Sequence, residues 1–229
     1  MITFSGLQEK VSPMNPKEFI KLFSVLDNQI IGKYVSIRKL KDLIAKSLYK
    51  YDIIEVDAIS SNNVDVGTLN VNAGYVHDND PDYVVIDLNV VYNPKDKKIE
   101  LNKYSWEYTK RLFADALVHE FIHNAQYIAR GGKDQHNNIK LKHAKSKDIK
   151  NLKYHGNEDE LNAFAVNAAS ELLYFYKTKA KVLKALKNFT TITIKQSPVF
   201  DTYNSLFKKN SKVMKKFIKL VTYHINKQT

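Results

Sequence analysis

The chain of 229 residues contains no cysteine. Disulfides, thiolate zinc sites and cysteine nucleophiles are therefore excluded, and any metal site must be built from His, Asp and Glu. The sequence also lacks an apolar run approaching the roughly 20 residues of a membrane-spanning helix, and its first residues lack the charged start and apolar stretch of a secretory signal. These absences predict a cytoplasmic protein, or a virion-associated one if a phage encodes it, with no membrane partner.

Arginine is scarce in this strongly basic chain. Only three of the 36 Lys and Arg residues are arginines, and 24 Asp and Glu leave a formal net charge of +12. Proteins that recognise phosphates or base edges usually depend on the bidentate fork of arginine. We therefore expect no more than weak, non-specific contact with nucleic acid through the lysines.

The order of the predicted elements divides the chain into three parts of one domain, residues 1–229. Helical periodicity dominates residues 1–50, a sheet and two long helices fall within 51–180, and short basic helices follow in 181–229. Hydrophobic residues make up 44% of the chain, which is enough for a packed core. The sequence therefore predicts an α+β fold.

Three stretches rich in β-branched and aromatic residues predict strands, at Ile53–Ala58, Leu69–Val76 and Tyr83–Tyr92. Apolar and polar residues alternate along part of the third stretch. Such alternation is typical of an antiparallel strand with one side facing solvent.

Two long helices are predicted on either side of a polar stretch. The first covers Ser105–Arg130, with Ser105 as its N-cap and Gly131 and Gly132 as a left-handed stop. The second covers Glu158–Lys179 and has a continuous apolar stripe. Residues 131–157 between them are long for a loop in a compact domain, which predicts a functional or mobile segment.

The first long helix contains an H-E-x-x-H motif, His119-Glu120-Phe121-Ile122-His123. At 100° per residue the two histidines lie about 40° apart on one face, so both imidazoles can bind one cation. Glu120 lies beside that face, where a general base can take a proton from the attacking water. With 7 His and 9 Glu in the chain, roughly 0.01 chance matches are expected. The motif therefore predicts a zinc site with Glu120 as the catalytic base.

A zinc site of this kind needs a third protein ligand. The candidates downstream are His136, His143, His155, Glu158, Asp159 and Glu160. Glu160 lies in the first turns of the second long helix, and Ala163 and Asn167 share its face. The small Ala163 would allow a second helix to approach, and Asn167 could donate a hydrogen bond to a ligand. Acidic residues in a first turn also favour the helix dipole, which is a purely structural alternative for some of them.

These residues resemble the motifs of zincin metallopeptidases of the glutamate-ligand type, in particular small HExxH peptidases of phages and bacteria. The pattern is H-E-x-x-H-x-x-Q, then Tyr, then E-x-x-A-x-A. Its counterparts here, within roughly residues 83–175, are His119, Glu120, His123, Gln126, Tyr154, Glu160, Ala163 and Ala165. Asn162 departs from the pattern, since related sequences often have an acid there.

The resemblance implies a zincin-like fold, in which a small antiparallel-edged sheet packs on the active-site helix and extra helices are added at both ends of the chain. It implies that Tyr83–Tyr92 is the edge strand that pairs with an extended substrate. It also implies a zinc-dependent metallopeptidase acting on a protein or peptide, in which His119, His123 and Glu160 hold Zn²⁺ and Glu120 activates water.

Two alternatives remain open at this point. SprT-like proteases, which act on nucleic-acid-associated proteins, use a third histidine in a His-Gly pair, and His155 precedes Gly156 here. The other alternative is a non-catalytic basic binding protein or virion-structural protein with a vestigial zinc site.

Overall fold

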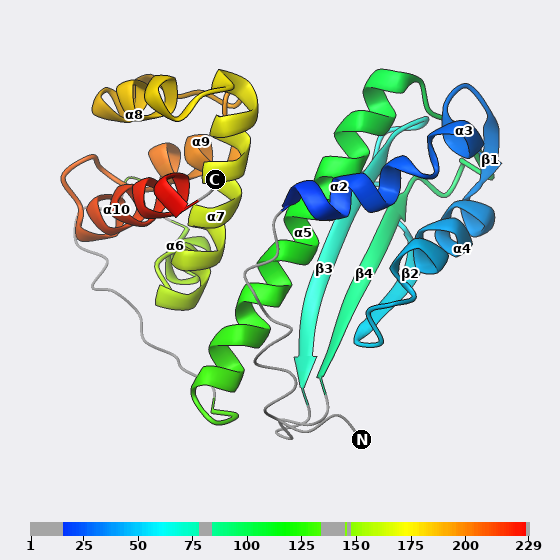
Figure 1. Cartoon of the computed structure of the whole chain (residues 1–229), viewed down its shortest axis with the longest axis horizontal. Helices are drawn as coiled ribbons and strands as arrows, with labels where there is room; N and C mark the ends of the chain where they lie inside the picture. Colours follow the sequence, from blue (N-terminus) through cyan, green and yellow to red (C-terminus); the bar gives the residue numbers. More distant parts are fainter. Residues whose placement is uncertain (1–15, 78–83, 134–144, 146–147, 228–229) are drawn as a thin grey trace. The chain divides into compact units, whose positions relative to one another are not determined.

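The computed structural model of the protein describes residues 16–77, 84–133, 145 and 148–227. The chain divides into two compact units, residues 1–133 and 134–229, and most of their elements are labelled in Figure 1. The first unit combines helices with strands, and the described part of the second is helical. The fold is α+β with a small mixed sheet, so the predicted fold class is confirmed at this level.

The first unit begins with short helices and ends with one long helix. Its elements in chain order are α2 (Pro16–Ser24), α3 (Asp27–Ile30), β1 (Tyr34–Ser36), α4 (Ile37–Leu48), β2 (Ile54–Ser60), β3 (Leu69–His77), β4 (Val84–Tyr92), β5 (Lys98–Glu100) and α5 (Lys103–Ala129). β1 and β5 pair antiparallel as a separate two-stranded sheet, which the sequence did not predict.

The main sheet has the strand order β2-β4-β3. β4 pairs parallel with β2 and antiparallel with β3, so the sheet is mixed. The expectation that Tyr83–Tyr92 forms the edge strand is therefore wrong: β4 is central, with main-chain partners on both sides, and Tyr83 lies outside the described residues. Ile86, Leu88 and Val90 are fully buried on one face of β4. Any strand of a sheet covered on one face shows that alternation, which is why it did not distinguish a central strand from an edge.

α5 is the central helix of the first unit and packs against β3, β4 and α2. The sequence predicts this helix nearly to the residue, but the expected N-cap is wrong. Asn102, and not Ser105, caps the helix, and its side chain accepts a hydrogen bond from the Ser105 backbone N–H. Asn and Ser are similarly good caps, and the Asn lies three residues earlier.

The C-terminus of α5 is a Schellman motif. Gly132 N–H donates to the Tyr127 carbonyl over 3.1 Å, and Gly131 N–H donates to the Ile128 carbonyl over 2.9 Å. Gly131 and Gly132 have φ of 64° and 77°, in the left-handed region that glycine adopts without a Cβ clash. The predicted glycine stop is confirmed.

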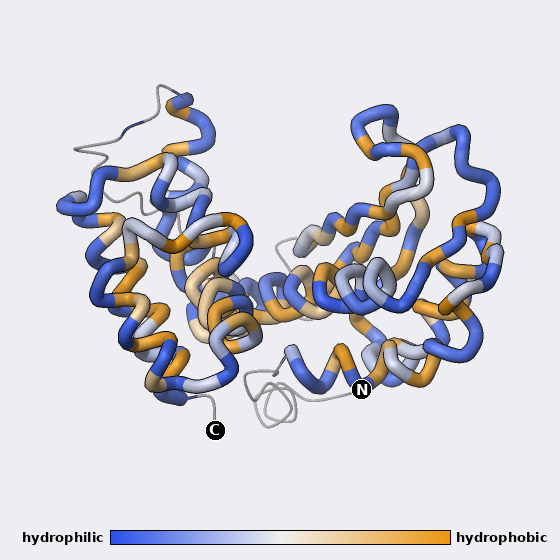
Figure 2. The backbone as a smooth tube through the Cα atoms, turned by 90° about the horizontal axis from the view of Figure 1, so that it is seen from above, coloured by the Kyte–Doolittle hydropathy of each residue, from blue (hydrophilic) through white to orange (hydrophobic). Residues whose placement is uncertain are grey.

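The second unit is a bundle of helices. Its elements are α6 (Ile149–His155), α7 (Glu158–Tyr176), α8 (Lys179–Lys187), the 3-10 turn η1 (Phe189–Thr191), α9 (Pro198–Leu206) and α10 (Lys212–Lys227). α7 carries buried alanines that allow α10 to pack closely against it. The Tyr203 and Phe217 rings stack with centroids 3.8 Å apart, joining α9 to α10. Hydrophobic and hydrophilic segments alternate along these helices (Figure 2).

Two expectations for this unit need correction. The stretch 131–157 is not a continuous loop, because α6 forms within it and the Asp148 side chain caps that helix. Seven residues are too few for helical periodicity to stand out in a polar segment. α7 also ends at Tyr176 and not at Lys179, since Lys177 adopts a left-handed φ of 66° and Thr178 caps the next helix. None of the described helices is both long enough and apolar enough to cross a membrane.

Candidate metal centre

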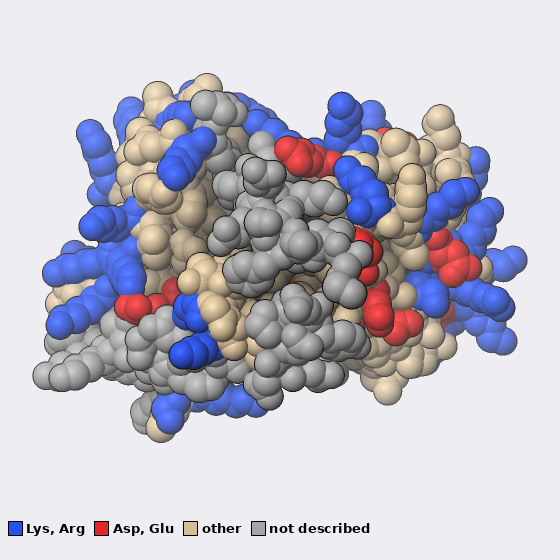
Figure 3. Space-filling model, turned by 60° about the horizontal axis from the view of Figure 1, so that its bottom comes forward, with Lys and Arg blue, Asp and Glu red and all other residues tan. Residues whose placement is uncertain are grey.

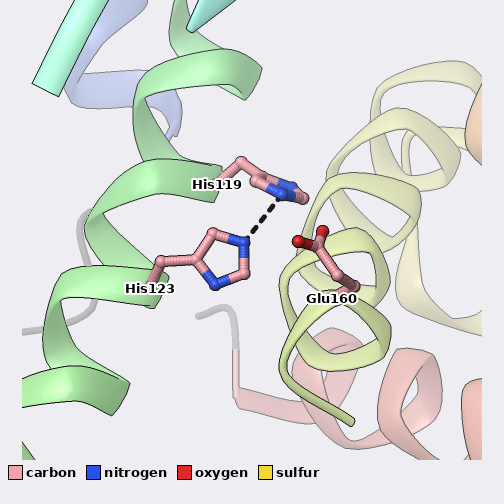
Figure 4. Close-up of side chains that lie close together, drawn as sticks. All are labelled: His119, His123 and Glu160. Carbon is pink, nitrogen blue, oxygen red and sulfur yellow. Dashed lines mark hydrogen bonds between the residues drawn. The ribbon is translucent and has the colours of Figure 1, made fainter. Parts of the chain in front are cut away.

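His119 and His123 project from one face of α5, as the motif predicts (Figure 4). Their Nε2 atoms face each other at 3.0 Å. Two nitrogens bound to one tetrahedral zinc would lie about 3.3 Å apart, given bonds of about 2.0–2.1 Å. His119 is buried and His123 is half-buried, so both rings are held by their surroundings. The pair therefore already has nearly the spacing that a shared cation requires.

Gln126 sets the orientation of the His123 ring. Its Oε1 lies 3.1 Å from His123 Nδ1, one helical turn further along α5. An Nδ1–H that donates to this oxygen leaves Nε2 with its lone pair, directed at His119. Outer contacts of this kind fix the tautomer of metal-binding histidines. Gln126 is part of the sequence motif, but its contact with His123 could be seen only in the structure.

Glu120 is buried, with 8% of its surface exposed. It follows His119 on α5, so its carboxylate leaves the helix about 100° around from that histidine and about 60° from His123. This placement is beside the histidine pair and not between the two rings. The helical geometry thus places Glu120 next to the histidine pair on the circumference of α5.

Glu160 lies in the first turn of α7, which Asn157 caps by accepting a hydrogen bond from the Asp159 N–H. Among the described residues, His119, His123 and Glu160 form a group that could hold a metal ion (Figure 4). Each offers one ligand atom, and these atoms lie within 4.8 Å of one another. The neighbouring Glu158 is outside this group and forms an ion pair with Lys216 of α10.

The charge on Glu160 affects a buried tyrosine of its own unit. Burial raises the pKa of Tyr203 well above its ordinary value, and the nearby carboxylate of Glu160 raises it further. The Tyr203 hydroxyl donates to the His155 carbonyl over 3.0 Å. Tyr203 therefore remains a neutral hydrogen-bond donor at all ordinary pH values.

His155, the alternative third ligand, is not part of the group. Its Nδ1 lies 3.0 Å from the Asn151 carbonyl of its own helix, and its ring stacks on Phe164 with centroids 5.1 Å apart. The other histidine candidates, His136 and His143, lie outside the described residues. Within the described part of the chain, Glu160 is thus the candidate that joins the histidine pair.

Three further residues of α7 were singled out in the sequence. Ala163 is fully buried, and Asn167 is 6% exposed. Asn167 Oδ1 has no hydrogen-bond partner in the part of the chain that the structure describes. Asn162, which departs from the family pattern, lies 3.0 Å from the Nε2 of His224 on α10. Asn162 therefore links two helices of the second unit.

The structure also places an aromatic cluster beside the histidine pair, which the sequence did not predict. The His77 ring stacks on Tyr127 with centroids 4.2 Å apart, and Tyr75 contacts both rings. The Tyr75 hydroxyl lies 3.5 Å from Oδ1 of the buried Asn124. Tyr127 is one turn beyond His123, so helical spacing alone could have placed it on the same side of α5 as the histidines. Tyr75 and His77 come from β3, and no local pattern indicates which helix covers them.

The chain matches no protein-family model, no curated protein and no solved structure. The likeness to zincin peptidases therefore depends on the motif residues and on the group that they form.

Proposed function

We propose that the protein is a zinc-dependent metallopeptidase. The observation that carries this proposal is the group of two imidazoles and one carboxylate, with the buried Glu120 next to its first histidine. Two neutral nitrogens and one charged oxygen, with no thiolate in the chain, are the donors of a hydrolytic zinc site of the His₂Glu type.

Both histidines lie on α5, so the spacing that suits a zinc ion depends on this one helix. Their Nε2 atoms are 3.0 Å apart, and the Gln126 contact leaves the His123 Nε2 available as a ligand. Zinc held by His119, His123 and Glu160 would supply a Lewis acid that polarises the scissile carbonyl and lowers the pKa of the attacking water.

Glu120 would act as the general base. Its carboxylate takes the proton from the attacking water and then donates it to the nitrogen of the leaving amine. The low exposure of Glu120 keeps bulk water away from this proton transfer.

An extended peptide would bind along β3. In the part of the chain that the structure describes, β3 pairs only with β4, so its other edge offers main-chain donors and acceptors. Tyr75 and His77 on this strand contact Tyr127 of α5, which lies one turn beyond His123. This strand replaces β4 as the proposed site of substrate pairing.

The test is a Glu120→Gln variant, with Glu158→Gln as a matched control in another acidic residue near the candidate ligands. We expect Glu120→Gln to keep about one zinc per chain and to lose peptide hydrolysis by about 10²–10⁴-fold. Glu158→Gln should keep both zinc and activity, because Glu158 forms an ion pair with Lys216. Zinc content by elemental analysis and cleavage of a broad peptide library measure the two quantities.

The outcomes separate the alternatives. Loss of zinc in Glu120→Gln would show that Glu120 is a ligand and not the base. A wild-type protein that holds zinc but cleaves no peptide would support the non-catalytic alternative.

A further inference from the structure

The net positive charge of the protein comes from its second unit. Residues 134–229 contain nineteen lysines, no arginine and seven acidic residues, a formal charge of +12. Residues 1–133 contain seventeen basic and seventeen acidic residues, a formal charge of zero. A lysine-rich composition alone would raise the net charge of both units. The excess of lysine over acidic residues in one unit alone therefore indicates a function specific to that unit.

Two helices carry much of this excess. α8 and α10 together hold nine lysines and no acidic residue. On α10, five lysines and one tyrosine fall within about 120° of the helix circumference and extend over about 24 Å. We name these residues the lysine stripe: Lys212, Lys215, Lys216, Lys219, Tyr223 and Lys227. Figure 3 shows one face of the molecule, on which basic side chains are prominent.

Most of the lysine stripe is exposed and not neutralised. Lys216 is half-buried and paired with Glu158, and the other members are exposed. Among the described residues, Lys216 is the one member with a carboxylate within ion-pair distance. The side chain of Tyr223 is 49% exposed, and Lys227 Nζ lies 4.8 Å from the centre of its ring. The stripe thus combines a row of cations with an accessible aromatic ring.

The opposite face of α10 is buried, which excludes binding of this helix to a membrane surface. Val213, Phe217 and Val221, with their neighbours on that face, are buried in the core of the second unit. A helix that binds a membrane surface inserts its apolar face into the lipid. α10 could not do so without unfolding the unit.

We propose that the lysine stripe of α10 binds the phosphate backbone of a single-stranded nucleic acid, without sequence preference. The row of ammonium groups matches a linear polyanion, and binding releases counterions from the strand. The exposed Tyr223 ring offers a surface on which a base can stack. The second unit has no arginine with which to form bidentate contacts to bases, so the sequence of the strand is not read. This proposal does not depend on the metallopeptidase proposal.

The test compares wild type with the triple variant Lys212→Gln, Lys219→Gln, Lys227→Gln. The matched control is Lys39→Gln, Lys46→Gln, Lys50→Gln, which removes the same charge from exposed positions of the first unit. Lys50 also lies 4.8 Å from a tyrosine ring, that of Tyr51, as Lys227 does from Tyr223. Fluorescence anisotropy with an oligothymidylate about 20 nucleotides long, a duplex of equal length and anionic vesicles gives the affinities over a series of salt concentrations.

We expect the wild type to bind the oligothymidylate with an affinity that falls linearly with salt on logarithmic axes. The triple variant should bind roughly tenfold to a hundredfold more weakly and lower the slope by about 2, while the control should retain both affinity and slope. Equal losses in variant and control, no binding at low salt, tighter binding to the duplex, or binding to vesicles alone would each overturn the proposal. Circular dichroism of both variants checks that the helices remain folded.

Discussion

The two ring nitrogens of His123 make different contacts. Nδ1 contacts Gln126, and Nε2 faces His119. The spacing of the histidines follows from helical geometry and could be predicted from the sequence. The ring rotations and the Gln126 contact depend on side-chain torsions, which no sequence pattern specifies.

A single residue, His224, makes the free energy of unfolding depend on pH. Burial lowers its pKa below the ordinary value of 6.5, and the nearby Lys227 lowers it further. Between the folded pKa and 6.5 the unfolded chain binds more protons, so stability rises with pH in that window and is lost as pH falls through it. The neutral ring donates to Asn162 when its Nε2 carries the proton.

We therefore expect the free energy of unfolding to decrease below about pH 6.5. His224→Gln can keep the hydrogen bond to Asn162 but does not titrate, so its decrease should be smaller than that of wild type. Urea denaturation at about pH 7.5 and about pH 5.5 measures the difference. An identical pH dependence in both proteins would show that His224 does not contribute.

At the scale of elements, long and strongly patterned segments were predictable and short ones were not. α5 begins and ends within two residues of the bounds expected from the sequence. β1, β5 and α6 are three to seven residues long, and their sequences carry too few periods to indicate a structure. The order of strands depends on pairing between distant segments, so no local pattern could correct the edge position that the resemblance implied for β4, which lies in the centre.

The N-terminus of α5 gives a prediction at this scale. Asn102→Ala removes the side chain that accepts from the Ser105 N–H, and should lower the free energy of unfolding by about 0.5–2 kcal/mol. Ser105→Ala keeps that N–H and should cost less, although the Ser105 hydroxyl also contacts Asn102. Urea midpoints of the two variants test this order. A larger loss in Ser105→Ala would restore Ser105 as the main cap.

At the scale of the whole molecule, metal binding and stability are linked. A ligand that binds only the folded state stabilises it by about 2.7 kcal/mol when its concentration is a hundred times Kd. For a chain of this size that corresponds to a rise in Tm of several degrees.

We expect zinc to raise the Tm of wild type, and Glu160→Ala to abolish most of that rise. His155→Ala should lower the starting Tm, because its ring packs on Phe164, but should keep the rise caused by zinc. Calorimetry with zinc and with a chelator separates the two effects. A rise that survives in Glu160→Ala but disappears in His155→Ala would assign the third ligand to His155.

One lysine differs in kind from those on the surface. Lys110 of α5 is 1% exposed, and its Nζ lies 3.0 Å from Asp27, 3.0 Å from Ser24 and 2.7 Å from Glu107. Acylating reagents and lysine-modifying enzymes need an amine that they can reach. The Lys110 amine is therefore inaccessible to modification in the folded protein. A modified Lys110 would show that the first unit of that molecule had unfolded at least locally.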